Sequence, residues 1–176
     1  MDDTATSYSL RGQLPLARAG VDRAGHLRSD EEWLDRAWSD PRSRSFVVAE
    51  GKVAVDEGQL VLERLNEMPG GERFFLGVDN EQLAFFAVHV DGPHPDSRAA
   101  GLRQAAPVLD DRDGGLMVHA VALANWHQAH GHCSRCGALT TVTYAGHVRR
   151  CPVDGSEHFP RTDPVVRRTM VTAFRV

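Results

Sequence analysis

Two patterns of apolar and polar positions divide the chain. Between residues 45 and 92, short apolar runs alternate with turn residues, whereas between 115 and 130 apolar residues recur at helical spacing. The short runs predict β-strands at residues 46–49, 59–62, 73–78 and 82–90. The Gly, Asp and Asn residues between them suit tight turns, so we expect an antiparallel meander rather than a βαβ series.

Two pairs of adjacent phenylalanines, at 74–75 and 85–86, lie in these predicted strands. Neighbouring side chains of a strand point to opposite faces of the sheet, so each pair places one ring on each face. One ring of each pair must therefore be buried by another element that packs on the sheet. We expect the chain after the Gly-Pro-His-Pro break at 92–95 to supply it, through a short helix at 97–105 and a longer helix after it.

Two further features define the helices. The first helix is expected to begin at Ser29, a candidate N-cap followed by three acids, and to end at Asp40-Pro41. Its apolar face comprises Trp33, Leu34, Ala37 and Trp38. The long helix is expected at 115–130, and its apolar stripe comprises Leu116, Ala120, Leu123 and His127. Trp126 is interpreted as a core residue.

The remaining segments are expected to be irregular. Residues 1 to about 30 contain few apolar positions, and an edge strand is predicted near 14–16. Asp110, Asp111 and Asp113 are interpreted as a solvated loop, because they complete no oxygen-ligand spacing for a metal.

Composition excludes several function classes. The 176 residues include 20 basic and 24 acidic side chains, which gives a net charge of -4. That balance argues against a protein whose whole surface binds nucleic acid or anionic lipid. The opening is polar and acidic, and no apolar run reaches membrane-spanning length, so we expect a cytoplasmic protein that makes no membrane contact.

The three cysteines carry the clearest chemistry. Cys133, Cys136 and Cys151 fall within nineteen residues, and no other cysteine occurs. An odd count with a C-x-x-C pair favours a bound metal over structural disulfides. Two short strands fit between Cys136 and Cys151, and a hairpin of that length returns Cys151 to the first pair. The pattern predicts a zinc ribbon.

The fourth zinc ligand has two candidates. Asp154 stands where a symmetrical second C-x-x-C would place its thiolate, and His158 lies four residues further along. Both residue types bind zinc, and we rank Asp154 first because its register matches the first knuckle. The alternatives are a degenerate site without metal, or three buried cysteines that act as small apolar residues. If zinc binds, its role is structural, because no open coordination position with a general base is evident.

Four segments in order resemble the N-terminal region and zinc ribbon of NADH pyrophosphatases, which are Nudix hydrolases. These segments are LANWH at 123–127, HCSRCG at 132–137, GHVRRC at 146–151 and HFPRTDP at 158–164. The resemblance implies an α+β domain and, in the intact family, hydrolysis of NADH to NMNH and AMP. It also implies NADH, NAD or NAD-capped RNA as ligands, and a possible homodimer.

One departure from the family matters. The family continues after Asp163-Pro164 into a Nudix domain, whose glutamates hold Mg²⁺ or Mn²⁺, and no segment of this chain carries that G-x5-E-x7-R-E-x2-E-E-x-G box. We therefore expect a truncated or frameshifted product without catalytic residues and without activity of its own. Residues 162–176 would be the aberrant start of the missing domain.

Other residues carry weaker hypotheses. The resemblance places Phe159 at a position that lines the nucleotide pocket, although packing against the ribbon explains it equally well. Arg149, Arg150 and Arg161 give this segment local positive charge. With Phe159 they define a rival interpretation, a free-standing zinc ribbon module that binds RNA or a protein partner.

The expected fold class is α+β. It comprises an N-terminal domain at 1–130, with an antiparallel β-sheet and two or three helices, followed by a zinc ribbon at 131–161.

Overall fold

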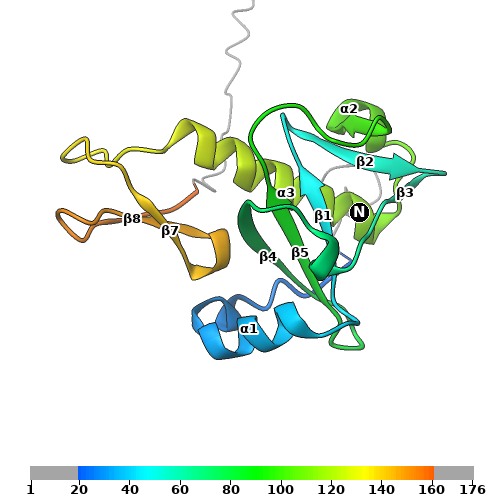
Figure 1. Ribbon diagram of the computed structural model, residues 1–176, viewed down its shortest axis with the longest axis horizontal. Helices are drawn as coiled ribbons and strands as arrows, with labels where there is room; N and C mark the ends of the chain where they lie inside the picture. The colour runs from blue at the N-terminus through cyan, green and yellow to red at the C-terminus, as the bar shows by residue number, and fades with distance from the viewer. Residues whose placement is uncertain (1–19, 161–176) are drawn as a thin grey trace, which may run out of the picture.

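A computed structural model of the chain describes residues 20–160 (Figure 1). Its helices are η2 (Gly25–Ser29), α1 (Glu31–Ser39), η3 (Leu65–Glu67), α2 (Leu102–Ala105), α3 (Asp111–Ala129) and η4 (Tyr144–Gly146). Its strands are β1 (Arg44–Val48), β2 (Lys52–Asp56), β3 (Gln59–Leu60), β4 (Glu72–Val78), β5 (Ala84–His89), β6 (Ala99–Gly101), β7 (Thr141–Thr143), β8 (Val148–Arg150) and β9 (Glu157–His158). The α+β fold class is confirmed. The edge strand predicted near 14–16 lies outside the described residues.

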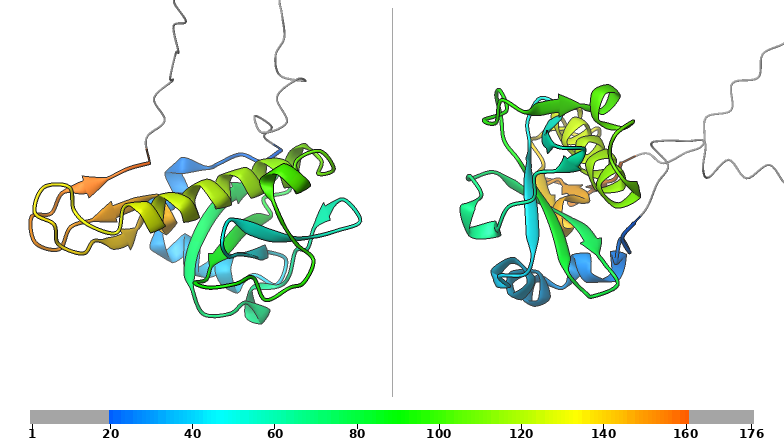
Figure 2. Two further views of the ribbon diagram at one scale, coloured as in Figure 1. Left: turned by 90° about the horizontal axis from the view of Figure 1, so that it is seen from above. Right: turned by 90° about the vertical axis from the view of Figure 1, so that its right-hand side faces the viewer.

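The described chain contains three sheets of three strands each, in the orders β1-β5-β4, β3-β2-β6 and β7-β8-β9. We call residues 20–130 the mixed-sheet region and residues 131–160 the ribbon. Helix α3 belongs to the mixed-sheet region along most of its length, and the ribbon lies at its C-terminal end (Figures 1 and 2).

The predicted meander is wrong in one respect. Strands β4 and β5 form an antiparallel hairpin, but β1 pairs parallel with β5, in the register Arg44 to Phe85 through Val48 to His89. The parallel pair arises because the chain leaves β1 to build β2 and β3 of the second sheet and then returns through β4. Local turn signals show where strands end, but not which strand a later one will join.

Two elements of the second sheet escaped prediction. Strand β2 contains a short apolar run, Val53 to Val55, between two turn signals, and the turns obscured it. Where one helix was predicted at 97–105, the structure has a strand followed by a shorter helix. The strand is β6, which pairs with β2, and the helix is α2, which contains four residues.

The phenylalanine pairs behave as expected, with one ring on each face of the first sheet. Phe74 and Phe85 lie in the larger core beneath α3, and Phe75 and Phe86 lie in a second core. Helix α3 thus covers one ring of each pair, as predicted, and helix α1 covers the other ring on the opposite face. The ring centroids of Trp33 and Phe75 are 5.3 Å apart, and α1 adds a further edge-to-face pair between Trp38 and Phe86. The sheet is therefore covered by helices on both faces.

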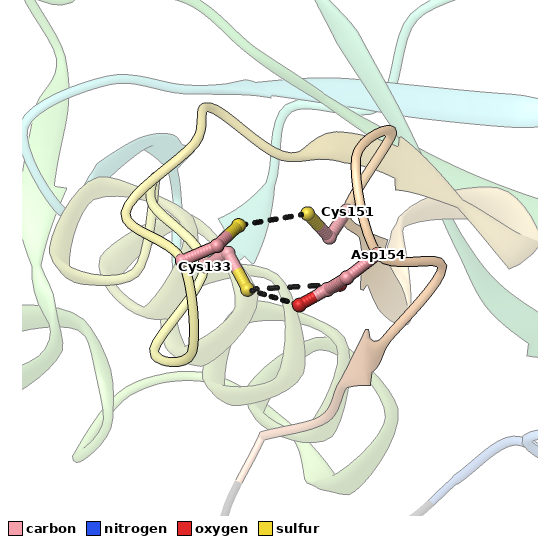
Figure 3. A group of neighbouring side chains, drawn as sticks. Cys133, Cys151 and Asp154 are labelled. Atoms are coloured by element: carbon pink, nitrogen blue, oxygen red, sulfur yellow. Dashed lines mark hydrogen bonds between the residues drawn. The ribbon is translucent and has the colours of Figure 1, made fainter.

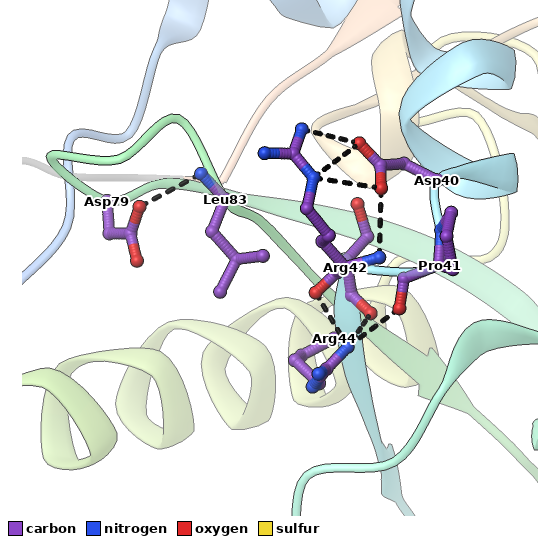
Figure 4. A network of polar contacts seen from close by, with 7 residues as sticks. Asp40, Pro41, Arg42, Arg44, Asp79 and Leu83 are labelled. Atoms are coloured by element: carbon purple, nitrogen blue, oxygen red, sulfur yellow. Dashed lines mark hydrogen bonds and ion pairs between the residues drawn. The ribbon is translucent and has the colours of Figure 1, made fainter.

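Helix α1 begins one residue later than expected. Asp30 is its N-cap, because the carboxylate accepts a hydrogen bond of 2.9 Å from the backbone N–H of Trp33. The helix ends at Asp40, as predicted. There the carboxylate pairs with Arg42, and Arg44 donates to three carbonyls of the same turn, which fixes the path into β1 (Figure 4).

The predicted acidic loop at 110–113 is wrong, because α3 begins there. Asp110 caps the helix by accepting from the backbone N–H of Asp113 at 2.8 Å. Asp113 is fully buried and accepts from the N–H of Leu60 and from Arg112, so it joins the helix start to β3. A solvated loop and a buried cap use the same residue types, and local sequence does not separate them.

The expected stripe of α3 is buried in full. The buried members are Leu116, Ala120, Leu123 and His127, and Trp126 is buried beside them. Among the described residues, no helix has both the length and the apolar character needed to cross a membrane.

Candidate metal centre

Two matched turns hold the cysteines. The N–H of Cys133 donates to Ala138 O, and Gly137 N–H donates back to Cys133 O. Cys151 repeats the pattern, since its N–H donates to Ser156 O and Gly155 N–H donates back to its carbonyl. Both glycines have positive φ, 75° and 72°, a conformation that glycine adopts without strain. The second turn is therefore a structural copy of the first.

This repeat places Asp154 in the position that Cys136 occupies in the first turn. The ligand atoms of Cys133, Cys136, Cys151 and Asp154 all lie within 4.8 Å of one another (Figure 3). The sulfur atoms of Cys136 and Cys151 are 3.5 Å apart. Four ligands at zinc–sulfur distances of about 2.3 Å around a tetrahedral ion would stand about 3.8 Å apart, so the arrangement has the right size for zinc.

The charges at this cluster favour a cation. Hydrogen bonding with the Ser156 side chain lowers the pKa of the Cys133 thiol to about 6. Hydrogen bonds from Ser156 also hold the pKa of Asp154 well below its usual range. A thiolate and a carboxylate 3.6 Å apart repel each other unless a proton or a metal ion lies between them. The donor set, with three sulfur atoms and one oxygen atom, fits zinc.

His158 lies beside the cluster, outside the group of four. Its Nε2 is 3.3 Å from Ser156 Oγ, and the same hydroxyl donates to Asp154 at 2.6 Å. Ser156 thus stands between the two candidate ligands. The sequence offered no signal for Ser156, because its role comes from the shape of the turn.

The ribbon joins the mixed-sheet region through buried polar groups. His127 of α3 stacks on Phe74, with 5.0 Å between the ring centroids, and its Nε2 donates to Gly146 O at 2.8 Å. Arg149 donates to His127 Nδ1 at 2.9 Å, which fixes the neutral tautomer of that ring. His147 contacts Phe75 O through Nε2 at 2.7 Å. These contacts escaped prediction because they join residues far apart in sequence.

The basic platform of the rival RNA-binding interpretation is not assembled as expected. Arg149 is buried, and its guanidinium is occupied by Thr140 and His127. Arg150 is exposed, and Arg161 lies outside the described residues. One described arginine therefore remains for that surface.

Phe159 follows β9 and is 57% exposed. Its ring lines a cavity between α3, η2 and the ribbon. Phe159 is therefore not a buried core residue among the residues that the structure describes.

A mixed α+β region followed by a cysteine ribbon defines the class of fold. Sequence comparison adds the family: the NADH pyrophosphatase-like rudimentary NUDIX domain matches residues 37–126, just over half of the chain. The chain belongs to this family.

Two relatives extend the comparison. The NAD-capped RNA hydrolase NudC of Mycobacterium tuberculosis (strain ATCC 25618 / H37Rv) is 33% identical over 175 residues, covering 93% of this chain and 54% of that protein. The human mitochondrial NAD(P)H pyrophosphatase NUDT13 is 42% identical over 94 residues, covering 51% of this chain and 26% of that protein. The chain thus spans about half the length of the first relative.

Proposed function

We propose that the ribbon binds one structural zinc ion through Cys133, Cys136, Cys151 and Asp154. The observation that carries this proposal is the repeat of the first cysteine turn in the second, which brings the Asp154 carboxylate to the position of a fourth thiolate. In this assignment protein atoms supply all four ligands, which is typical of structural rather than catalytic zinc. The ion would cross-link the two cysteine turns.

Metal analysis of the purified chain tests this assignment. We expect one zinc per chain, lost in Asp154→Ala and retained in His158→Ala, which is the matched control from the same turn. Asp154→Cys should also retain zinc, because it completes a four-thiolate site. Full zinc content in Asp154→Ala, with loss in His158→Ala, would make His158 the fourth ligand.

We further propose that the chain provides the N-terminal and ribbon portion of an NAD(H) pyrophosphatase, with domains at 1–130 and 131–161. Its similarity to NudC and NUDT13 supports this role. In this proposal no residue of the chain is catalytic, and Mg²⁺ or Mn²⁺ acts with a Nudix domain that carries the glutamates. Phe159, exposed at the rim of a cavity, contacts the nucleotide of NADH, NAD or NAD-capped RNA.

An activity assay tests this second part. The chain, mixed with NADH and Mg²⁺ or Mn²⁺, is expected to release no AMP above the level of its Cys133→Ser variant. Release of AMP well above that level would contradict the absence of catalytic residues. Chromatography with light scattering tests the accompanying expectation of a homodimer.

A further inference from the structure

Two thiols of the ribbon lie close together on different turns. Cys136 belongs to the first cysteine turn and Cys151 opens the second, and their sulfur atoms are 3.5 Å apart. The sulfur atoms of a disulfide are about 2.05 Å apart, so an approach of about 1.5 Å separates this pair from a covalent bond. Rotation of the two side chains supplies a movement of that size, and the backbone of both turns stays in place.

The first of these thiols is open to solvent. Cys136 is exposed, whereas Cys133 and Cys151 are buried. The neighbours Arg135 and Gly137 are exposed too, and a Cβ atom added to Gly137 would meet nothing within 4 Å beyond its chain neighbours. A small oxidant therefore reaches Cys136 first. An accessible cysteine beside a second cysteine that resolves it is the arrangement that oxidises selectively.

The third cysteine of the cluster is engaged by other groups. Cys133 Sγ accepts a hydrogen bond from the backbone N–H of Arg135 at 3.4 Å and lies 3.4 Å from Ser156 Oγ. It also faces the Asp154 carboxylate at 3.6 Å. A carboxylate forms no disulfide, so three cysteines and one aspartate allow one disulfide at most. These contacts favour a disulfide that leaves Cys133 as the free thiol.

We propose that Cys136 and Cys151 form a peroxide-sensitive modification site, which converts reversibly to a disulfide and releases the metal ion. The Cys136 thiolate attacks one oxygen of hydrogen peroxide and breaks the O–O bond, which gives a sulfenic acid and hydroxide. The Cys151 thiolate then attacks the oxidised sulfur and displaces a second hydroxide. The two thiolates lose two electrons and the peroxide gains them. Two protons from solvent convert both hydroxides to water.

The disulfide removes two of the four ligands proposed for zinc. Thiolate is the form of cysteine that binds a metal, and a disulfide contains none. Cys133 and Asp154 remain, and they supply half of a tetrahedral site. The inference rests on the proposed function only for the release of zinc, because the approach of the two sulfur atoms is a property of the chain itself.

Peptide mapping of the purified, zinc-loaded chain tests this site. The chain is treated with hydrogen peroxide, the remaining thiols are alkylated in denaturant, and the tryptic peptides are analysed by mass spectrometry. Arginines between successive cysteines separate all three into different tryptic peptides, so the partners of a disulfide are identified directly. We expect a cross-link between Cys136 and Cys151 and alkylation of Cys133 alone. A thiol reductant should return three alkylated cysteines.

A chromophoric chelator follows zinc in the same samples. We expect one zinc ion released per cross-link, and renewed zinc binding after reduction. Peroxide first destroyed with catalase is the control and should release none. Two matched variants each keep two thiols and lose one proposed ligand: Cys133→Ser should form the same cross-link, and Cys136→Ser, which lacks the exposed thiol, should form a disulfide more slowly.

The outcomes separate this site from the metal assignment. A main product that contains Cys133 in a disulfide, or three alkylated cysteines after excess peroxide, overturns the site. A chain purified without zinc that still cross-links Cys136 to Cys151 contradicts the metal and supports the thiol pair, whereas a zinc-loaded chain that forms no disulfide does the reverse. If loss of a ligand unfolds the ribbon in both variants, the peptide map of the unmodified chain decides the result alone.

Discussion

The mixed-sheet region and the ribbon are stabilised in different ways. The first sheet buries apolar side chains on both faces, in two separate cores. The described ribbon has strands of two or three residues, and its buried hydrophobic residues are Val148, Cys133 and Cys151. Hydrophobic burial stabilises the mixed-sheet region, whereas the described ribbon buries few apolar side chains and, on the proposed assignment, depends on the metal and on the buried polar joint.

Removal of the metal is expected to have the largest effect on the stability of the ribbon. Removal of zinc by a chelator, or the variant Cys151→Ser, should unfold the ribbon and leave the mixed-sheet region folded, because structural zinc contributes on the order of 10 kcal/mol to small sites. Amide hydrogen exchange measures this region by region. Ribbon amides that stay protected after chelation would show that the two regions are stabilised alike.

The joint between the regions should respond to acid. Burial lowers the pKa of His127 to about 4, and the charge of Arg149 acts in the same direction. The unfolded chain takes up a proton near pH 6.5 and the folded chain does so only near pH 4, so this stability is complete above pH 6.5. The free energy of unfolding should fall by on the order of 3 kcal/mol from this histidine as the pH drops from 6.5 to 4.

The control for acid sensitivity is His127→Gln, which lacks the titrating ring. Denaturant unfolding of both chains across this pH range cancels the contribution of the cysteines. The variant should lose less stability on acidification than the unmodified chain. Parallel curves for the two proteins would contradict the assignment.

The mixed-sheet core should tolerate less change than its surface. Leu116→Ala removes a fully buried side chain of α3 and should cost about 3 kcal/mol of unfolding free energy. Zinc content should remain at the level of the unmodified chain, because Leu116 lies outside the ribbon. A variant that loses zinc together with stability would show that the two regions fold as one unit.

The smallest effect concerns a helix cap. Asp30→Ala removes the acceptor for the Trp33 N–H and should lower stability by about 1 kcal/mol. Ser29→Ala, at the neighbouring position, is the control and should change little. Thermal unfolding distinguishes the two, and an equal loss in both variants would argue against the cap at Asp30.

Local sequence predicted the features that depend on neighbours in the chain. The split of the phenylalanine pairs, the stripe of α3 and the register of Asp154 all follow from short-range periodicity. Features that need distant partners were missed or misread. Asp113 was placed in a loop because its partner Leu60 lies 53 residues away, and Arg149 was placed on the surface because its acceptors were not evident.

Helix α3 has a consequence for communication within the protein. Its 19 residues extend for about 28 Å, and the same helix contributes to the larger core and to the ribbon joint. A substitution that shifts this helix would therefore disturb the larger core and the ribbon joint together.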